Sequence, residues 1–81
     1  MQITLFQPCK IGVALIRELD LDFIPFPGLE FNESSSSRYS RKVKSVRCDI
    51  PTGRIVAEMA GELTELEAEL LRHEGWEFVL K

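Results

Sequence analysis

The sequence has few of the residues that build metal centres and hydrolytic active sites. Its 81 residues include one histidine, His73, and two cysteines, Cys9 and Cys48. Because a structural zinc site uses about four Cys or His ligands, this set predicts no metal centre. The five glycines are scattered singly, which excludes a glycine-rich phosphate-binding loop. We therefore expect no metal, no cofactor and no enzymatic activity.

Long apolar runs are also absent. No segment approaches the roughly 20 apolar residues that a membrane helix needs, and the first ten residues show neither the basic segment nor the apolar core of a signal peptide. Hydrophobic residues make up 44% and charged residues 28% of the chain, which is typical of soluble globular proteins. We expect a cytoplasmic protein without membrane contact, folded as a single domain over 1–81.

The two cysteines are expected to be buried, reduced thiols in this setting, with a disulfide as the alternative. Cys9 directly follows Pro8, a residue favoured at the first position of a helix. A thiol at a helix N-terminus has a lowered pKa and is a better nucleophile. Thiol activity at Cys9 therefore remains a third functional hypothesis.

The N-terminal half predicts a strand over 3–6 that ends at Pro8. Residues 9–19 fit two patterns, since helical spacing links Ile11, Leu15 and Leu19 while strand alternation links Ile11, Val13 and Leu15. We favour a helix there, followed by a strand over 21–26. The sequence Pro-Phe-Pro-Gly at 25–28 is a strong strand terminator, and a short extended segment is expected at 29–31.

The middle of the chain combines a polar stretch with a hairpin. Residues 32–41 include the serine run Ser34–Ser37 and predict a flexible loop; its phosphorylation is an open alternative, because arginines follow. Residues 42–60 alternate and contain a Pro-Thr-Gly turn, which predicts a β-hairpin. On its first strand, the side with Val46, Cys48 and Ile50 is the predicted core side.

The C-terminal segment carries the clearest helix signals. Thr64 and Glu67 have the spacing of a capping box, and Gly75 is placed to end the helix. The predicted apolar face is formed by Leu66, Leu70 and Leu71. A last strand over 77–80 should close the core. The predicted order β-α-β-β-β-α-β indicates an α+β fold, with two helices packed on a mixed β-sheet around a central hairpin.

Parts of the chain resemble glutaredoxin-like proteins. The run Ile3-Thr4-Leu5-Phe6, then Cys9 and the segment from Ala14 to Phe23, are similar to the opening β-α-β of that family, and Gly61 to Leu66 after the hairpin is similar to the start of its last helix. The resemblance implies a thiol protein. The usual cysteine pair is missing, because Phe6 stands at the place of its first cysteine.

Charge is strongly segregated along the sequence. Residues 18–33 sum to -5, residues 38–54 to +5 and residues 55–81 to -5, within a total of -3. The basic segment supplies the candidate binding residues, which are Arg38, Arg41, Lys42, Lys44, Arg47 and Arg54.

Three roles are open for these cations. The basic hairpin lies beside the acidic face of the C-terminal helix and is neutralised there, it docks a protein partner or another copy of the chain, or it contacts nucleic-acid phosphates. Tyr39 is the one aromatic residue inside the segment, so the segment offers little surface on which the bases of a single-stranded nucleic acid could stack. We therefore predict a non-catalytic binding or regulatory module that docks a protein, or itself as a homodimer, with nucleic-acid binding as the alternative.

Overall fold

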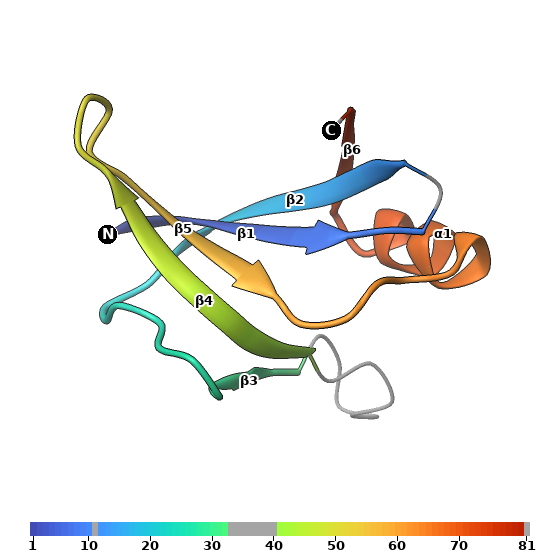
Figure 1. Ribbon diagram of the computed structural model, residues 1–81, viewed down its shortest axis with the longest axis horizontal. Helices are drawn as coiled ribbons and strands as arrows, with labels where there is room; N and C mark the ends of the chain where they lie inside the picture. Colours follow the sequence, from blue (N-terminus) through green and yellow to red (C-terminus); the bar gives the residue numbers. More distant parts are fainter. Residues whose placement is uncertain (11, 33–40, 81) are drawn as a thin grey trace.

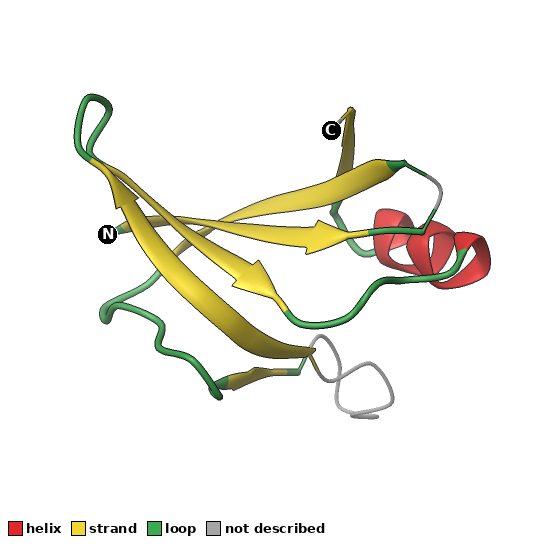
Figure 2. Cartoon of the chain, in the orientation of Figure 1, coloured by secondary structure: helices red, strands yellow, loops and turns green. Residues whose placement is uncertain are grey.

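The computed structural model describes residues 1–10, 12–32 and 41–80. In this part of the chain, six strands form one sheet in the spatial order β3-β4-β5-β1-β2-β6. The sheet curls into a half-barrel, and one helix, α1, lies at one end of it (Figures 1 and 2). The bounds are β1 Gln2–Pro8, β2 Val13–Asp20, β3 Glu30–Phe31, β4 Arg41–Asp49, β5 Arg54–Met59, α1 Glu65–His73 and β6 Glu77–Leu80.

Strand β1 lies in the middle of the sheet. It pairs antiparallel with β2 and parallel with β5, while β2 pairs antiparallel with β6 on its other side. Ile3 and Leu5 of β1 have no exposed surface, as expected for alternate residues that face the core. The parallel contact continues past the strands, because Lys10 N donates to Leu63 O and Leu63 N donates to Pro8 O.

Helix α1 begins and ends as its sequence predicts. The Glu67 N–H donates to Thr64 Oγ1 at 3.3 Å, and the Thr64 N–H donates to Glu67 Oε1 at 3.1 Å, which completes the capping box. Gly75 has a φ of 104°, a left-handed conformation that favours glycine. The N–H of Trp76 then donates to Leu71 O, which brings the buried indole back against the helix.

The core lies between the concave side of the sheet and α1. Its members from the strands include Ile3, Leu5, Leu15, Val43, Ala57 and Met59, and α1 adds Ala68 and Leu71. The predicted apolar face of the helix is wrong in part, because Leu66 is 72% exposed and Leu70 is 37% exposed. The buried residues of α1 are instead Ala68 and Leu71. They are three positions apart, so they lie on the same face of the helix.

The predicted fold of two helices on a mixed sheet is wrong. Residues Val13–Asp20 form strand β2 where we expected a helix, so the segment follows the alternation of Val13 and Leu15. The reason is non-local, because β2 hydrogen-bonds to β1 on one side and to β6 on the other. The opening unit is therefore an antiparallel β-hairpin, not the β-α-β unit that the glutaredoxin resemblance implies.

The expected strand over 21–26 is also absent from the described structure, where 21–29 connects β2 to β3 as a loop. Pro25 is buried, but Phe23, Ile24 and Phe26 are about half exposed. Prolines at positions 25 and 27 remove two backbone donors, which disfavours pairing along this segment. The extended segment at 29–31 is confirmed as β3. Residues 33–40, which include Ser34–Ser37 and most of the predicted flexible loop 32–41, lie outside the described residues.

The central hairpin is confirmed as β4 and β5, but its core side changes along β4. The register shifts between Val43 and Ser45, which marks a β-bulge. As a result Val43 and Val46, which regular alternation would place on opposite faces, both face the core. Cys48 and Ile50, predicted on the core side, are exposed because the hairpin extends beyond the core there.

Candidate protein-docking surface on the β4–β5 hairpin

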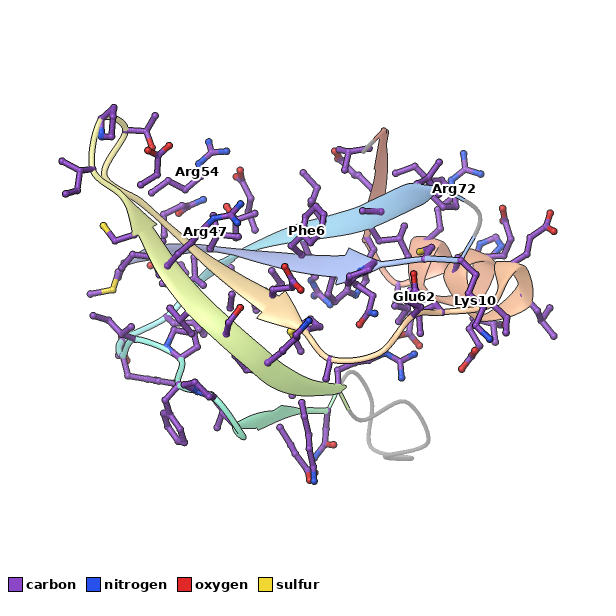
Figure 3. The ribbon with its side chains drawn as sticks, viewed as in Figure 1. Phe6, Lys10, Arg47, Arg54, Glu62 and Arg72 are labelled. Carbon is purple, nitrogen blue, oxygen red and sulfur yellow. The ribbon has the colours of Figure 1, made fainter. Side chains whose placement is uncertain are left out.

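The structure describes five of the six predicted binding cations, and all five belong to one hairpin. Arg41, Lys42, Lys44 and Arg47 lie on β4, and Arg54 begins β5; Arg38 lies outside the described residues. Figure 3 labels Arg47 and Arg54 on the part of the hairpin that points away from α1. The hairpin thus brings the basic segment together, but the bulge and the twist of β4 distribute its side chains over different faces.

Three of these cations have acidic partners on other strands of the sheet. Lys42 Nζ lies 3.7 Å from Glu30 Oε1 on β3. Lys44 Nζ lies 3.6 Å from Glu58 Oε2 on β5, and Arg54 Nη2 lies 3.8 Å from Glu18 Oε1 on β2. The exposed ion pairs are each worth about 0–1 kcal/mol in stability. Each pair places a carboxylate beside a cation and so reduces the local positive charge of the hairpin.

The positive charge of Arg41 also acts on an acidic group at the start of α1. The backbone N–H and hydroxyl of Thr64 both donate to the Glu67 carboxylate and lower its pKa, and the positive charge of Arg41 adds a smaller lowering. The ion pairs at Lys42, Lys44 and Arg54 are with carboxylates of strands, not with the acidic face of the helix, where the intramolecular hypothesis placed them.

Arg47 is different from the other basic residues of the hairpin. Its side chain is exposed, and it has no ion pair within the described ranges. In the sheet, Arg47 pairs with Val56 of β5, an uncharged neighbour. An exposed guanidinium without an internal carboxylate has hydrogen-bond donors available to a ligand.

The outer edge of β4 is open for most of its length. Strand β3 pairs only with Arg41 and Lys42, and two further backbone bonds join Val43 to Gly28 and Leu29. Beyond Val43, no other described strand pairs with this edge, and Figure 1 shows the end of the hairpin standing clear of the sheet. An open edge is a template for another extended chain.

The backbone groups that face this open edge can be assigned. The carbonyl of Asp49 points toward the β5 side, because it accepts from the N–H groups of Thr52 and Gly53. The register from Ser45 to Asp49 has no shift, and in an antiparallel pair the residues alternate between facing the partner and facing away. The N–H and C=O groups of Val46 and Cys48 therefore face outward.

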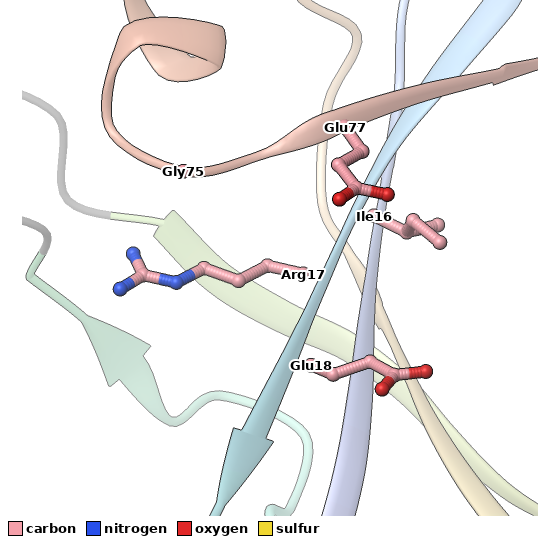
Figure 4. A pocket seen from close by; sticks show the side chains of 5 residues that line it. All are labelled: Ile16, Arg17, Glu18, Gly75 and Glu77. Atoms are coloured by element: carbon pink, nitrogen blue, oxygen red, sulfur yellow. The ribbon is translucent and has the colours of Figure 1, made fainter.

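The pockets on the surface are weaker candidates for a binding site than this edge. One open pocket of about 400 Å³ is lined by Ile16, Arg17, Glu18, Gly75 and Glu77. Figure 4 shows Arg17 on the opposite side of β2 from Ile16 and Glu18, so its charge and the carboxylates do not converge. A second hollow of about 330 Å³ adjoins the Lys44–Glu58 ion pair.

The two cysteines are free and have different surroundings. Cys9 is 1% exposed, and its Sγ lies 3.8 Å from the Gln7 carbonyl oxygen. The helix that would activate it is replaced by β2, so the basis for the thiol hypothesis is wrong. The prediction of a buried reduced thiol is confirmed for Cys9 and wrong for Cys48, which is exposed at the open edge.

Sequence reasoning missed two residues of this surface, Asp49 and Ile50. Ile50 is 86% exposed at the start of the turn, although alternation placed it in the core. Asp49 holds the turn through a 3.0 Å bond from Thr52 Oγ1 to its Oδ2. The Pro-Thr-Gly turn signal locates both residues at the end of the hairpin, but only the structure shows that this end extends past the core.

Neither a membrane-spanning helix nor a metal-binding cluster occurs among the residues described. No helix there has the length and hydropathy needed to cross a bilayer, and no group of three or more His, Cys, Asp or Glu side chains could hold a metal ion. Comparison of the chain with protein-family models, with curated proteins and with solved structures found no match.

Proposed function

We propose that this chain is a non-catalytic binding module that docks a protein through the outer edge and surface of hairpin β4–β5, in a cytoplasmic setting. The observation that carries the proposal is the open edge of β4 beyond Val43, with Arg47 beside it. Strand addition to such an edge supplies affinity through backbone hydrogen bonds, and exposed side chains supply specificity.

The charge layout favours a protein over a nucleic acid as ligand. A polyanion gains affinity from many simultaneous phosphate contacts, whereas Lys42, Lys44 and Arg54 each have a carboxylate within 4 Å. A protein strand needs fewer charges, since Arg47 can select one complementary carboxylate while the backbone of Val46 and Cys48 provides the pairing.

Site-specific photo-crosslinking in the cells that produce the protein tests this proposal. A photoreactive amino acid at Ser45, which is exposed on β4, should form a protein adduct, whereas the same group at the exposed Glu69 of α1 should not. Arg47→Asp should reduce the Ser45 adduct. Equal adducts from both positions, or no protein adduct from Ser45, would overturn docking at the hairpin.

A further inference from the structure

We propose that the chain docked by the hairpin is a second copy of itself, paired antiparallel through the two β4 edges about a two-fold axis at Cys48. This inference rests on the proposed function and names its partner. The edge offers the outward backbone groups of Val46 and Cys48. When Cys48 lies opposite Cys48 of the second copy, each N–H donates to the other's C=O, as in a narrow antiparallel pair.

The neighbouring structure and the charges select this register. A pairing centred on Val46 would run the end of the second hairpin into the edge beside Val43, which β3 and Leu29 already occupy. A pairing centred on Arg47 would place two guanidinium groups directly opposite each other, and like charges in that position are destabilising. The register centred on Cys48 avoids both conflicts.

The same register is complementary in charge. It places Arg47 opposite Asp49 of the second copy, and by symmetry the contact occurs twice. Arg47 has no ion pair elsewhere in the described chain. The Asp49 carboxylate accepts the Thr52 hydroxyl at Oδ2, which leaves Oδ1 for a second contact. Directly opposed side chains lie about 4.5–5.5 Å apart at Cβ, within reach of an ion pair.

The other face of the paired strands is apolar. Val46, Cys48 and Ile50 share this face, and the register brings Ile50 opposite Val46 of the second copy. Ile50 is 86% exposed in the single chain and Val46 is half-buried, so the pairing covers the most exposed large hydrophobic side chain of the described residues. Self-pairing therefore pairs the open edge, brings Arg47 to a carboxylate and covers Ile50.

Charge reversal tests the register through sedimentation velocity of the full chain. Because a five-residue strand pairing is a small interface, we expect a weak dimer, visible between roughly 10 µM and 1 mM. Arg47→Asp alone, or Asp49→Arg alone, places like charges opposite each other and should weaken self-association by about tenfold or more. An equimolar mixture of the two variants restores opposite charges at both contacts and should form a heterodimer.

The controls separate folding from pairing. The double variant Arg47→Asp with Asp49→Arg should dimerise like the original chain, and circular dichroism should show each variant folded. Glu69→Arg, a charge reversal at an exposed position of α1, should leave the dimer unchanged. A chain that stays monomeric to 1 mM, or single variants that dimerise normally, would overturn the inference.

The photo-crosslinked adduct distinguishes this failure from failure of the proposed function. An adduct at twice the 9.3 kDa chain mass supports the second copy. An adduct of another mass from Ser45, together with a monomeric chain, overturns the homodimer and keeps the docking function. Absence of any Ser45 adduct together with a monomeric chain overturns both.

Discussion

The orientation of α1 makes a sharp prediction, because two leucines of this short helix have opposite environments. Leu71 is completely buried between the helix and the sheet, whereas Leu66 is 72% exposed. Five positions separate them, which corresponds to about 140° around a helix with 3.6 residues per turn. The same substitution at the two positions therefore separates burial from helix propensity.

Leu71→Ala should lower the free energy of unfolding by about 2–5 kcal/mol, because it removes buried methyl groups and leaves a cavity. A domain of this length has a total stability of roughly 4–12 kcal/mol, so the variant should be close to unfolding. Leu66→Ala should change stability by less than about 0.5 kcal/mol, as expected for an exposed site.

Urea unfolding followed by far-UV circular dichroism measures both values, and thermal unfolding provides a second estimate. A loss of 1 kcal/mol lowers Tm by roughly 4–8 °C in a domain of this size, so the two variants should differ by at least about 6 °C. Equal losses at Leu66 and Leu71, or a larger loss at Leu66, would refute the packing of Ala68 and Leu71 against the sheet.

Three further predictions follow from local features. In native protein, Cys48 should react with a thiol reagent and Cys9 should react only after denaturation, which mass spectrometry counts as one and then two labels per chain. Thr64→Ala should cost about 0.5–2 kcal/mol as a lost helix cap and should raise the NMR-measured pKa of Glu67. Because the pKa of Glu67 is depressed in the folded state, the stability that its carboxylate contributes is present above the unfolded-state pKa and is lost as the pH falls through the folded-state pKa. The destabilisation caused by Thr64→Ala should therefore shrink at acid pH, and a destabilisation that grows there would contradict this. A short DNA duplex at roughly 50 mM salt should leave the amide NMR signals of β4 and β5 unmoved, and salt-sensitive shifts there would instead favour nucleic-acid binding.

Sequence patterns predicted best where the signal is local. Three such signals each depend on a few neighbouring residues: the capping box at Thr64 and Glu67, the glycine at the helix end, and the Pro-Thr-Gly turn. The structure confirms the helix and the hairpin that these signals predict. In each case the backbone groups find their hydrogen-bond partners within a few residues along the chain. These signals do not determine which side of an element meets the core.

The wrong predictions arose where distant segments decide the outcome. Residues 9–19 carry both periodicities, and pairing of β2 with β1 and β6 selects the strand. The bulge beside Val43 changes which residues of β4 face the core, and no pattern in the sequence marks it. The acidic partners of Lys42, Lys44 and Arg54 lie on three different strands, so the charge runs alone could not show that Arg47 has no ion pair among the described residues.

Amide hydrogen exchange at the β4 edge tests the central claim most directly. In dilute protein the amides of Val46 and Cys48 should exchange fast, because they face the open edge, whereas the Arg47 amide, which faces β5, should be protected. Raising the concentration from roughly 10 µM to 1 mM should slow exchange at Val46 and Cys48 as the second copy pairs there. Exchange at these two amides that stays fast over the whole range, or that is already slow in dilute protein, would contradict docking of a second copy on this edge.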